Sequence, residues 1–253
     1  AREAGLPFVV APIPAADGAV LVRFCPRYTV AVFPYREGTV HSPLAESTTA
    51  ERQRVVELLV RLHDATDTVR ATATPTVDDL ALADRNVLER ALARLDVPWT
   101  TGPYGEPTRE LLGARQDQIR AALRTYDDLA ARIRARGGAW VLTHGEPKAD
   151  NLLVTPTGLE LVDWDTVLVA PPARDLWMVD AGAGTEIDAY AELTGRTIPA
   201  DETTFYRLRW DLADLGAFVA WFTRPHVQDA DTEIGWNAIV EYVRIDERWP
   251  GLL

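Results

Sequence analysis

Cysteine, lysine and long apolar runs are scarce in this 253-residue chain, and each scarcity excludes a class of protein. The single cysteine, Cys25, excludes an internal disulfide framework and a zinc site built from cysteines. No apolar run approaches the roughly 20 residues that cross a bilayer, and residues 1–5 lack the pattern of a signal peptide. We therefore expect a globular cytoplasmic protein with no membrane segment.

Positive charge is also in deficit. The chain has 26 basic and 38 acidic residues, a formal net charge of −12 at pH 7. Because the phosphate backbone of a nucleic acid requires a basic surface, we expect no nucleic-acid partner. The acidic balance suits a cationic small molecule instead. Lys148 is the only lysine, and it falls in the polar loop described next.

The densest group of chemically capable side chains lies beyond the middle of the chain. A short apolar run, residues 139–142, leads into a polar loop (residues 144–151) that carries His144, Glu146 and Asn151. Loops that a rigid scaffold holds in place commonly carry chemistry. No Ser/His/Asp or metal-histidine cluster accompanies the histidines, so a hydrolase or phosphatase is a weaker interpretation.

A β-hairpin is predicted directly after the polar loop. Two short apolar runs, residues 152–154 and 159–162, are separated by the turn-type sequence Thr-Pro-Thr-Gly. If the first and last turn residues pair, Asn151 lies opposite Val162 and next to Asp163. An amide oxygen and a carboxylate then converge at one end of the hairpin, which is the oxygen environment that Mg²⁺ prefers.

The pattern His-x-Glu-x-Lys-x-x-Asn in the polar loop resembles the catalytic loop of the protein-kinase superfamily. The Val-Asp-Trp-Asp that follows is similar to the second metal-binding segment of that superfamily, and an Asp-Leu pair comes about a dozen residues later. Together these motifs resemble the aminoglycoside phosphotransferase-like small-molecule kinases. The turn-rich segment over residues 98–107 resembles one in the spectinomycin phosphotransferase-like proteins, where helical insertions help to cover the acceptor.

This resemblance implies a role for each matching residue. Glu146 would orient and deprotonate the acceptor hydroxyl, and Lys148 would face the γ-phosphoryl group. Asn151 and Asp163 would hold Mg²⁺. Structural support of the loop would come from two further residues, His144 and Asp175. The family usually has Asp where Glu146 stands, and the extra methylene moves the carboxylate by about 1.5 Å.

Strand-like runs over residues 8–10, 19–24 and 28–33 precede the first long helical pattern, so we expect a small antiparallel sheet before residue 34. By resemblance, Pro34, Tyr35 and Arg36 form a hinge that binds the nucleotide. The alternative is a plain strand-to-helix turn. The family's glycine-rich loop and strand lysine do not precede Pro34, so we expect that roughly 60 to 90 residues of the N-terminal lobe are missing. In this form the chain should bind ATP poorly.

Sequence patterns predict helices over residues 47–64, 77–95, 205–222 and 234–248, and one long polar helix or two shorter ones over residues 108–136. His63, near the end of the first helix, is interpreted as a structural residue or one that faces the helix dipole. Five residues between and within these helices are candidates for acceptor binding: Trp99, Tyr104, Glu106, Asp211 and Asp214. The alternatives are a packed surface loop for the first three and a solvated acidic face for the two aspartates.

The predicted fold class is α+β, a protein-kinase-like fold with a remnant of the β-rich N-terminal lobe (residues 1–38) and a mostly helical lobe (residues 39–253). The predicted reaction moves the γ-phosphoryl of ATP or GTP to a hydroxyl of a small molecule, with an aminoglycoside or aminocyclitol antibiotic such as spectinomycin preferred. The alternatives are a kinase for choline, homoserine or a sugar, and a non-catalytic binding protein of the same fold. We expect a monomer or a homodimer.

Overall fold

The computed structural model describes residues 5–248. The chain divides into two compact units, and it crosses between them more than once. The first unit comprises Ala1–Asp78 and Gly138–Ile198, and the second comprises Asp79–Gly137 and Pro199–Leu253. The polar loop and its hairpin belong to the first unit.

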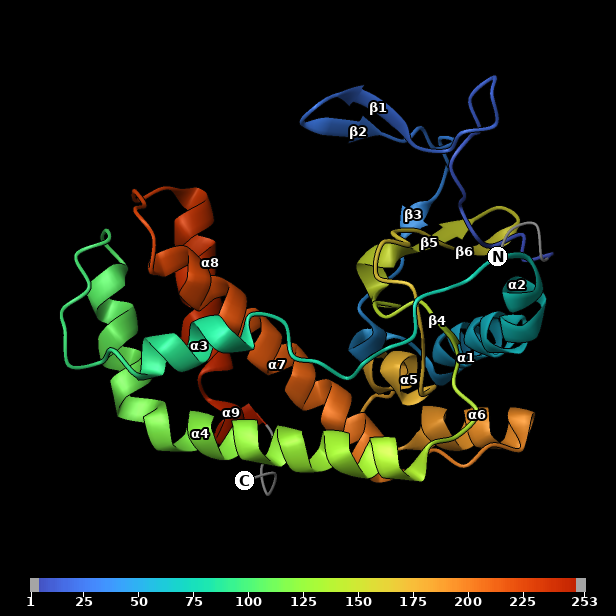
Figure 1. Cartoon of the computed structure of the whole chain (residues 1–253). Helices are drawn as coiled ribbons and strands as arrows, with labels where there is room; N and C mark the ends of the chain where they lie inside the picture. The colour runs from blue at the N-terminus through green and yellow to red at the C-terminus, as the bar shows by residue number, and fades with distance from the viewer. Residues whose placement is uncertain (1–4, 249–253) are drawn as a thin grey trace. The chain divides into compact units, whose positions relative to one another are not determined.

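The described residues of the first unit combine short strands with helices (Figure 1). Its strands are β1 (Val22–Cys25), β2 (Tyr28–Val30), β3 (Thr39–Val40), β4 (Val141–Thr143), β5 (Leu152–Thr155), β6 (Gly158–Leu161) and β7 (Leu168–Ala170). Its helices are α1 (Thr49–Asp64), α2 (Thr66–Thr72), α5 (Ala173–Val179) and α6 (Thr185–Thr194), and 3-10 turns lie at Leu44–Glu46 and Ala149–Asn151. The strands form three small antiparallel sheets, ordered β1-β2, β3-β5-β6 and β4-β7.

The predicted hairpin is confirmed, including its register. Thr155 pairs with Gly158 across the turn, and Leu152 pairs with Leu161. One step beyond the ladder, the amide of Val162 donates to the carbonyl of Asn151 at 3.0 Å. The turn residues and the alternation of the two strands therefore fix which side chains lie at the open end of the hairpin.

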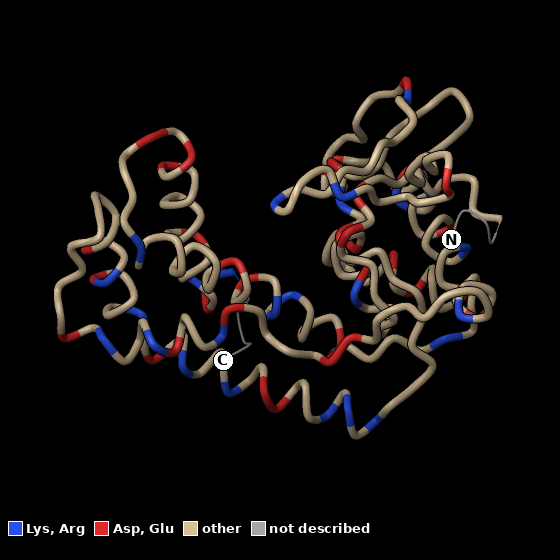
Figure 2. The backbone as a smooth tube through the Cα atoms, turned by 45° about the horizontal axis from the view of Figure 1, so that its top comes forward, with Lys and Arg blue, Asp and Glu red and all other residues tan. Residues whose placement is uncertain are grey.

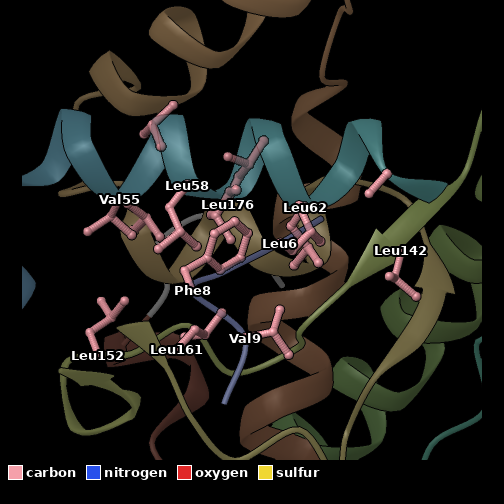
Figure 3. Packing of buried hydrophobic residues seen from close by; sticks show 14 of the residues in the cluster. Leu6, Phe8, Val9, Val55, Leu58, Leu62, Leu142, Leu152, Leu161 and Leu176 are labelled. Atoms are coloured by element: carbon pink, nitrogen blue, oxygen red, sulfur yellow. The ribbon is translucent and has the colours of Figure 1, made fainter. Parts of the chain in front are cut away.

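The first predicted helix is confirmed as α1. Thr48 caps it: its side chain accepts from the amide of Glu51, whose carboxylate accepts from the amide of Thr48 at 2.8 Å. This reciprocal capping box satisfies backbone donors that the first turn leaves unpaired. The apolar stripe of α1 is buried, and Figure 3 shows it against Phe8 and Leu161 in the core of the first unit. Burial of such side chains contributes about 1.5–3 kcal/mol each.

The second unit consists of helices among its described residues: α3 (Arg85–Leu92), α4 (Gly105–Arg136), α7 (Ala200–Phe222), α8 (Ala230–Tyr242) and α9 (Ile245–Arg248). Helix α7 contacts α3, α4 and α8, and it contributes many of the buried side chains. Charges of both signs follow one another along α4 (Figure 2). The long predicted helix over 108–136 is confirmed, since α4 contains it.

Three other predictions of secondary structure were wrong in part. Residues 77–84 are not helical, because Val77 bridges to Val169 and both Leu80 and Asp84 have left-handed backbone angles (φ 57° and 52°). The run over residues 8–10 forms an isolated bridge rather than a strand. The helix expected over 234–248 is interrupted between α8 and α9.

Among the strands and α-helices, the sequence analysis gave no bounds for β3, β7, α2, α5 and α6. Both strands have three residues or fewer, which is too short for a periodic pattern to show. Among residues 5–248, none of the helices combines the length and the apolar character that crossing a membrane requires.

Candidate active site

Strand β4 delivers the polar loop into the interior of the first unit. His144 is fully buried; its Nε2 lies 2.9 Å from the carbonyl of Val162, and its Nδ1 accepts from the amide of Glu146 at 3.2 Å. Burial lowers the pKa of His144, which favours the neutral imidazole. A neutral ring that donates through Nε2 and accepts through Nδ1 satisfies both contacts.

The carboxylate of Asp175, on α5, holds the start of the polar loop. It accepts hydrogen bonds from the amides of His144 at 2.9 Å and Gly145 at 2.6 Å, and from Nε2 of His63 at 3.0 Å. Burial acts to raise the pKa of Asp175, but the hydrogen bond and charge of His63 and the neighbouring cations outweigh it, so the pKa is lowered. Asp175 is thus an ionised brace inside the unit.

Gly145 is required by both conformation and space. Its φ is +100°, a region that side chains disfavour. A Cβ at this position would collide with the guanidinium of Arg174. That guanidinium donates to the hydroxyl of Thr143 at 2.8 Å and to the carbonyl of Thr166 at 2.7 Å. The loop therefore turns tightly beneath an arginine that ties it to the segment after the hairpin.

Glu146 and Lys148 form an ion pair, with Lys148 Nζ 3.3 Å from Glu146 Oε2, and both side chains are partly exposed. The side chain of Asn151 is buried, and its Nδ2 donates to the backbone carbonyl of Glu146 at 2.9 Å. The amide oxygen of Asn151 is then the atom that a cation would take. The structure thus brings Glu146, Lys148 and Asn151 together on one short loop.

Asp163 occupies the opposite strand end of the same hairpin, in a left-handed backbone conformation with φ +65°. Such a conformation is uncommon for a residue other than glycine and is concentrated at functional sites. Partial desolvation raises the pKa of Asp163, and the charges of Asp165 and Glu146 raise it further. Three carboxylates therefore crowd the open end of the hairpin.

Among residues 5–248, no group of three or more His, Cys, Asp or Glu side chains forms a cage that could hold a metal ion alone. A Mg²⁺ site in a phosphoryl-transfer protein does not need one, since this ion keeps several waters and substrate phosphates as ligands. Asn151 and Asp163 fit such a site, in which the protein supplies only some of the ligands. Asn151 offers an amide oxygen, and Asp163 offers a carboxylate that a nearby cation would stabilise.

The three residues predicted as a hinge lie between β2 and β3, outside regular structure. Tyr35 is 88% exposed. Arg36 makes an ion pair with Glu160 of β6 (Nε to Oε2, 3.0 Å), which connects this segment to the back of the hairpin. Pro34 is half-buried. Their proposed contact with a nucleotide stays a prediction.

The five candidates for acceptor binding all belong to the second unit. In the first turn of α4, the carboxylate of Glu106 accepts from the amide of Trp99 at 2.9 Å and from Arg109. The hydrogen bond from Arg109 is the largest of the interactions that lower the pKa of Glu106. The ring of Tyr104 stacks on Trp236, with centroids 5.6 Å apart.

On α7, the carboxylate of Asp211 is fully buried and accepts from Arg248 at 2.9 and 3.1 Å. Asp214, three residues on, is half-buried on the same helix. The arginine contact gives Asp211 a structural partner within its own unit. Binding of an acceptor by these two aspartates stays a prediction.

Three features of the site were not predicted from the sequence: Thr166, Arg174 and the contact of His63 with Asp175. The hydroxyl of Thr166 donates to the carbonyl of His144 at 2.7 Å. Both Thr166 and Arg174 flank motifs that the sequence displays, so their positions could have drawn attention. His63 lies on the buried stripe of α1, but its contact with Asp175 joins distant segments and leaves no local signal.

Comparison with known proteins agrees with this geometry. A model of the phosphotransferase enzyme family, also called APH, matches residues 2–197. The chain belongs to this family, and it has the protein-kinase-like α+β fold of the aminoglycoside phosphotransferases. It is accordingly a phosphotransferase of the small-molecule kinase type.

Among individual proteins, the chain is 29% identical over 248 residues to Protein StrN of Streptomyces griseus, covering 95% of this chain and 73% of that protein. Its fold is similar to spectinomycin phosphotransferase APH(9)-Ia in complex with ADP and spectinomycin (TM-score 0.75, 14% identity, covering 96% of this chain and 78% of the other). It is also similar to the choline kinase LicA of Streptococcus pneumoniae (TM-score 0.56, 13% identity, 96% and 76% covered).

Proposed function

We propose that this protein transfers the γ-phosphoryl group of ATP or GTP to a hydroxyl of a small molecule, with an aminocyclitol such as spectinomycin as the preferred acceptor. The observation that carries the proposal is the open end of the β5–β6 hairpin. There Asn151 and Asp163 come from paired strand ends, and the loop that carries Glu146 and Lys148 leads into the same point.

Each side chain has a task that suits its position. Glu146 accepts the proton of the acceptor hydroxyl and orients its oxygen. Lys148, held beside Glu146, offers positive charge to the phosphoryl group in transfer. Asp175 and His144 keep the loop in one geometry through buried hydrogen bonds. Positioning and charge stabilisation supply most of the rate enhancement in this class of reaction.

Mg²⁺ would be held by Asn151 and Asp163, and when bound it would neutralise the charge of the nucleotide's phosphates. Desolvation and the nearby carboxylates of Asp165 and Glu146 raise the pKa of Asp163, because they disfavour its anionic form. A bound cation would offset this repulsion, so Mg²⁺ fits the position. Asn151 is also oriented for this role, since its Nδ2 is occupied by the carbonyl of Glu146.

The preference for an aminocyclitol rests on charge and on resemblance. The chain carries a net charge of −12, which favours a cationic acceptor. The fold is similar to a spectinomycin phosphotransferase, but it is also similar to a choline kinase, so likeness of fold alone does not choose between the two acceptors. Binding of the acceptor by Trp99, Tyr104, Glu106, Asp211 and Asp214 stays a prediction.

The test is an acceptor panel. The protein, expressed from its complete reading frame, is incubated with Mg²⁺ and ATP or GTP and with hydroxylated amines led by spectinomycin. Mass spectrometry then detects a phosphorylated product. We expect a product that disappears in Asp163→Ala and persists in Asp150→Ala, a matched control in the polar loop whose side chain is exposed.

The other outcomes are informative. A product only from choline, homoserine or a sugar would keep the reaction and replace the acceptor. Nucleotide binding without a product from any acceptor would favour a binding protein that retains the fold without turnover. Turnover that survives Asp163→Ala would contradict the assignment of the site.

A further inference from the structure

Three helices of the first unit meet at one buried histidine. His63 comes from α1, and it lies between Asp175 of α5 and Tyr190 of α6. Its Nε2 is 3.0 Å from Asp175 Oδ2, and its Nδ1 is 2.8 Å from the hydroxyl of Tyr190. The exposed fractions of these three side chains are 1%, 0% and 0%. Polar groups at this depth are costly unless they are fully hydrogen-bonded.

The donor in the contact between His63 and Asp175 can be assigned. The lowered pKa of Asp175 keeps its carboxylate ionised, and an ionised carboxylate only accepts hydrogen bonds. His63 must therefore donate through Nε2. Burial raises the pKa of Tyr190, so its phenol keeps the proton, and this hydroxyl is the partner of Nδ1. His63 thus has a hydrogen-bond partner at each ring nitrogen, and it links Tyr190 to Asp175 in one chain of contacts.

The carboxylate at the end of this chain is the one that holds the polar loop. The oxygen of Asp175 that accepts from His63 also accepts from the amide of His144, and its other oxygen accepts from the amide of Gly145. A carboxylate side chain can rotate, so two backbone amides alone do not fix its plane. The bond from His63 adds a third anchor from a different helix.

We propose that His63, oriented by Tyr190, is a positioning residue for phosphoryl transfer: it fixes Asp175, and through Asp175 the backbone that precedes Glu146. This inference rests on the proposed function for its kinetic consequence. Its structural part, the anchoring of the loop amides, holds for any activity of the protein. His63 touches neither substrate nor nucleotide in this scheme, so it is not a catalytic residue.

Two substitutions of similar size separate hydrogen bonding from packing. Glutamine in His63→Gln can present an amide donor near the place of Nε2, whereas leucine in His63→Leu fills the space without a donor. We expect His63→Leu to lower kcat about 10- to 100-fold, with KM values nearly unchanged. We expect His63→Gln to recover most of that loss.

A second measurement does not require activity. Amide hydrogen exchange at His144 and Gly145, read by NMR, reports whether Asp175 still holds them. We expect exchange about tenfold faster in His63→Leu and close to wild type in His63→Gln.

Tyr190→Phe removes only the outer hydroxyl and should give a smaller change of about fivefold. Tyr126→Phe is its control, because the hydroxyl of Tyr126 is also buried and hydrogen-bonded, at 2.8 Å to Leu80, but in the second unit.

The outcomes divide cleanly. Equal losses in His63→Leu and His63→Gln would show a packing role and overturn the proposal, as would unchanged exchange in His63→Leu. Should the protein prove inactive on every acceptor, the exchange rates still decide whether His63 anchors the loop, and only the proposed function fails. Faster exchange with unchanged kcat would overturn the kinetic role of His63.

Discussion

Acidic side chains of the two candidate sites have opposite surroundings. At the hairpin of the first unit, Asp163 lies near Asp165 and Glu146, and together with desolvation these like charges raise its pKa. In the second unit, Glu106 accepts from Arg109, which lowers its pKa, and Asp211 is held by Arg248. The hairpin concentrates like charges, whereas Glu106 and Asp211 each have a guanidinium partner.

This difference separates two uses of the same chemical group. A carboxylate with an arginine partner stabilises the folded chain or costs it little. Crowded carboxylates oppose folding, so they persist where a bound cation or a reacting proton makes use of them. The strained backbone of Asp163 strengthens this reading, since strain is also concentrated at functional sites.

The largest expected effect is that of Asp163→Asn. We expect phosphoryl transfer to fall roughly 10³-fold, while the free energy of unfolding stays equal or rises, because a repelling charge is removed. Denaturant unfolding and product formation, measured on one preparation, check both parts. A variant that loses stability as well as activity would indicate a structural carboxylate, as in the second unit.

Glu146→Gln comes next. It keeps the shape of the side chain but removes the proton acceptor, so the rate should fall at least about 100-fold with little change in nucleotide affinity. Glu146→Asp shortens the side chain by about 1.5 Å and should retain part of the rate, because a carboxylate remains. A glutamine variant with wild-type turnover would remove Glu146 from its role.

Asp211→Asn should affect stability rather than chemistry. It weakens the charged hydrogen bonds from Arg248, and we expect a loss of about 2 kcal/mol in the free energy of unfolding. Asp214→Asn, on the same helix, is the control and should cost less. If both variants instead raise KM for the acceptor and unfold like the wild type, the acidic residues of α7 contact the acceptor.

The smallest effect concerns pH and His144. Burial lowers the folded-state pKa of His144, so the unfolded chain takes up a proton first as the pH falls. The contribution of His144 is present in full above the unfolded value of about 6.5 and is lost as the pH falls toward the folded value. Unfolding measured between pH 7 and pH 5 should show a weaker pH dependence in His144→Asn. Equal slopes would mean that His144 accepts a proton in the folded state.

Local features of the structure were predictable from the sequence. Helix α1 and the register of the β5–β6 hairpin depend on residues a few positions apart, and both were predicted. The pairing of Asn151 with Val162, next to Asp163, followed from that register, so the backbone that carries these two candidate residues was predictable from the sequence.

Features set by distant partners were not predictable. Residues 77–84 carry part of a helical pattern, but the bridge from Val77 to Val169 overrides it. The contact of His63 with Asp175 and Tyr190 joins three helices, and no spacing in the sequence reports it. Tertiary contacts of this kind place His63 against Asp175, the residue that holds the polar loop.

If the hairpin with its crowded carboxylates holds Mg²⁺ and a nucleotide, the two ligands should stabilise the folded protein jointly. The thermal unfolding midpoint of the protein, expressed from its complete reading frame, is measured with ATP and Mg²⁺ added separately and together. We expect the midpoint to rise most when both are present, and we expect Asp163→Asn to abolish this joint effect while Asp211→Asn keeps it. A joint stabilisation that survives Asp163→Asn would show that Mg²⁺ and the nucleotide bind without Asp163.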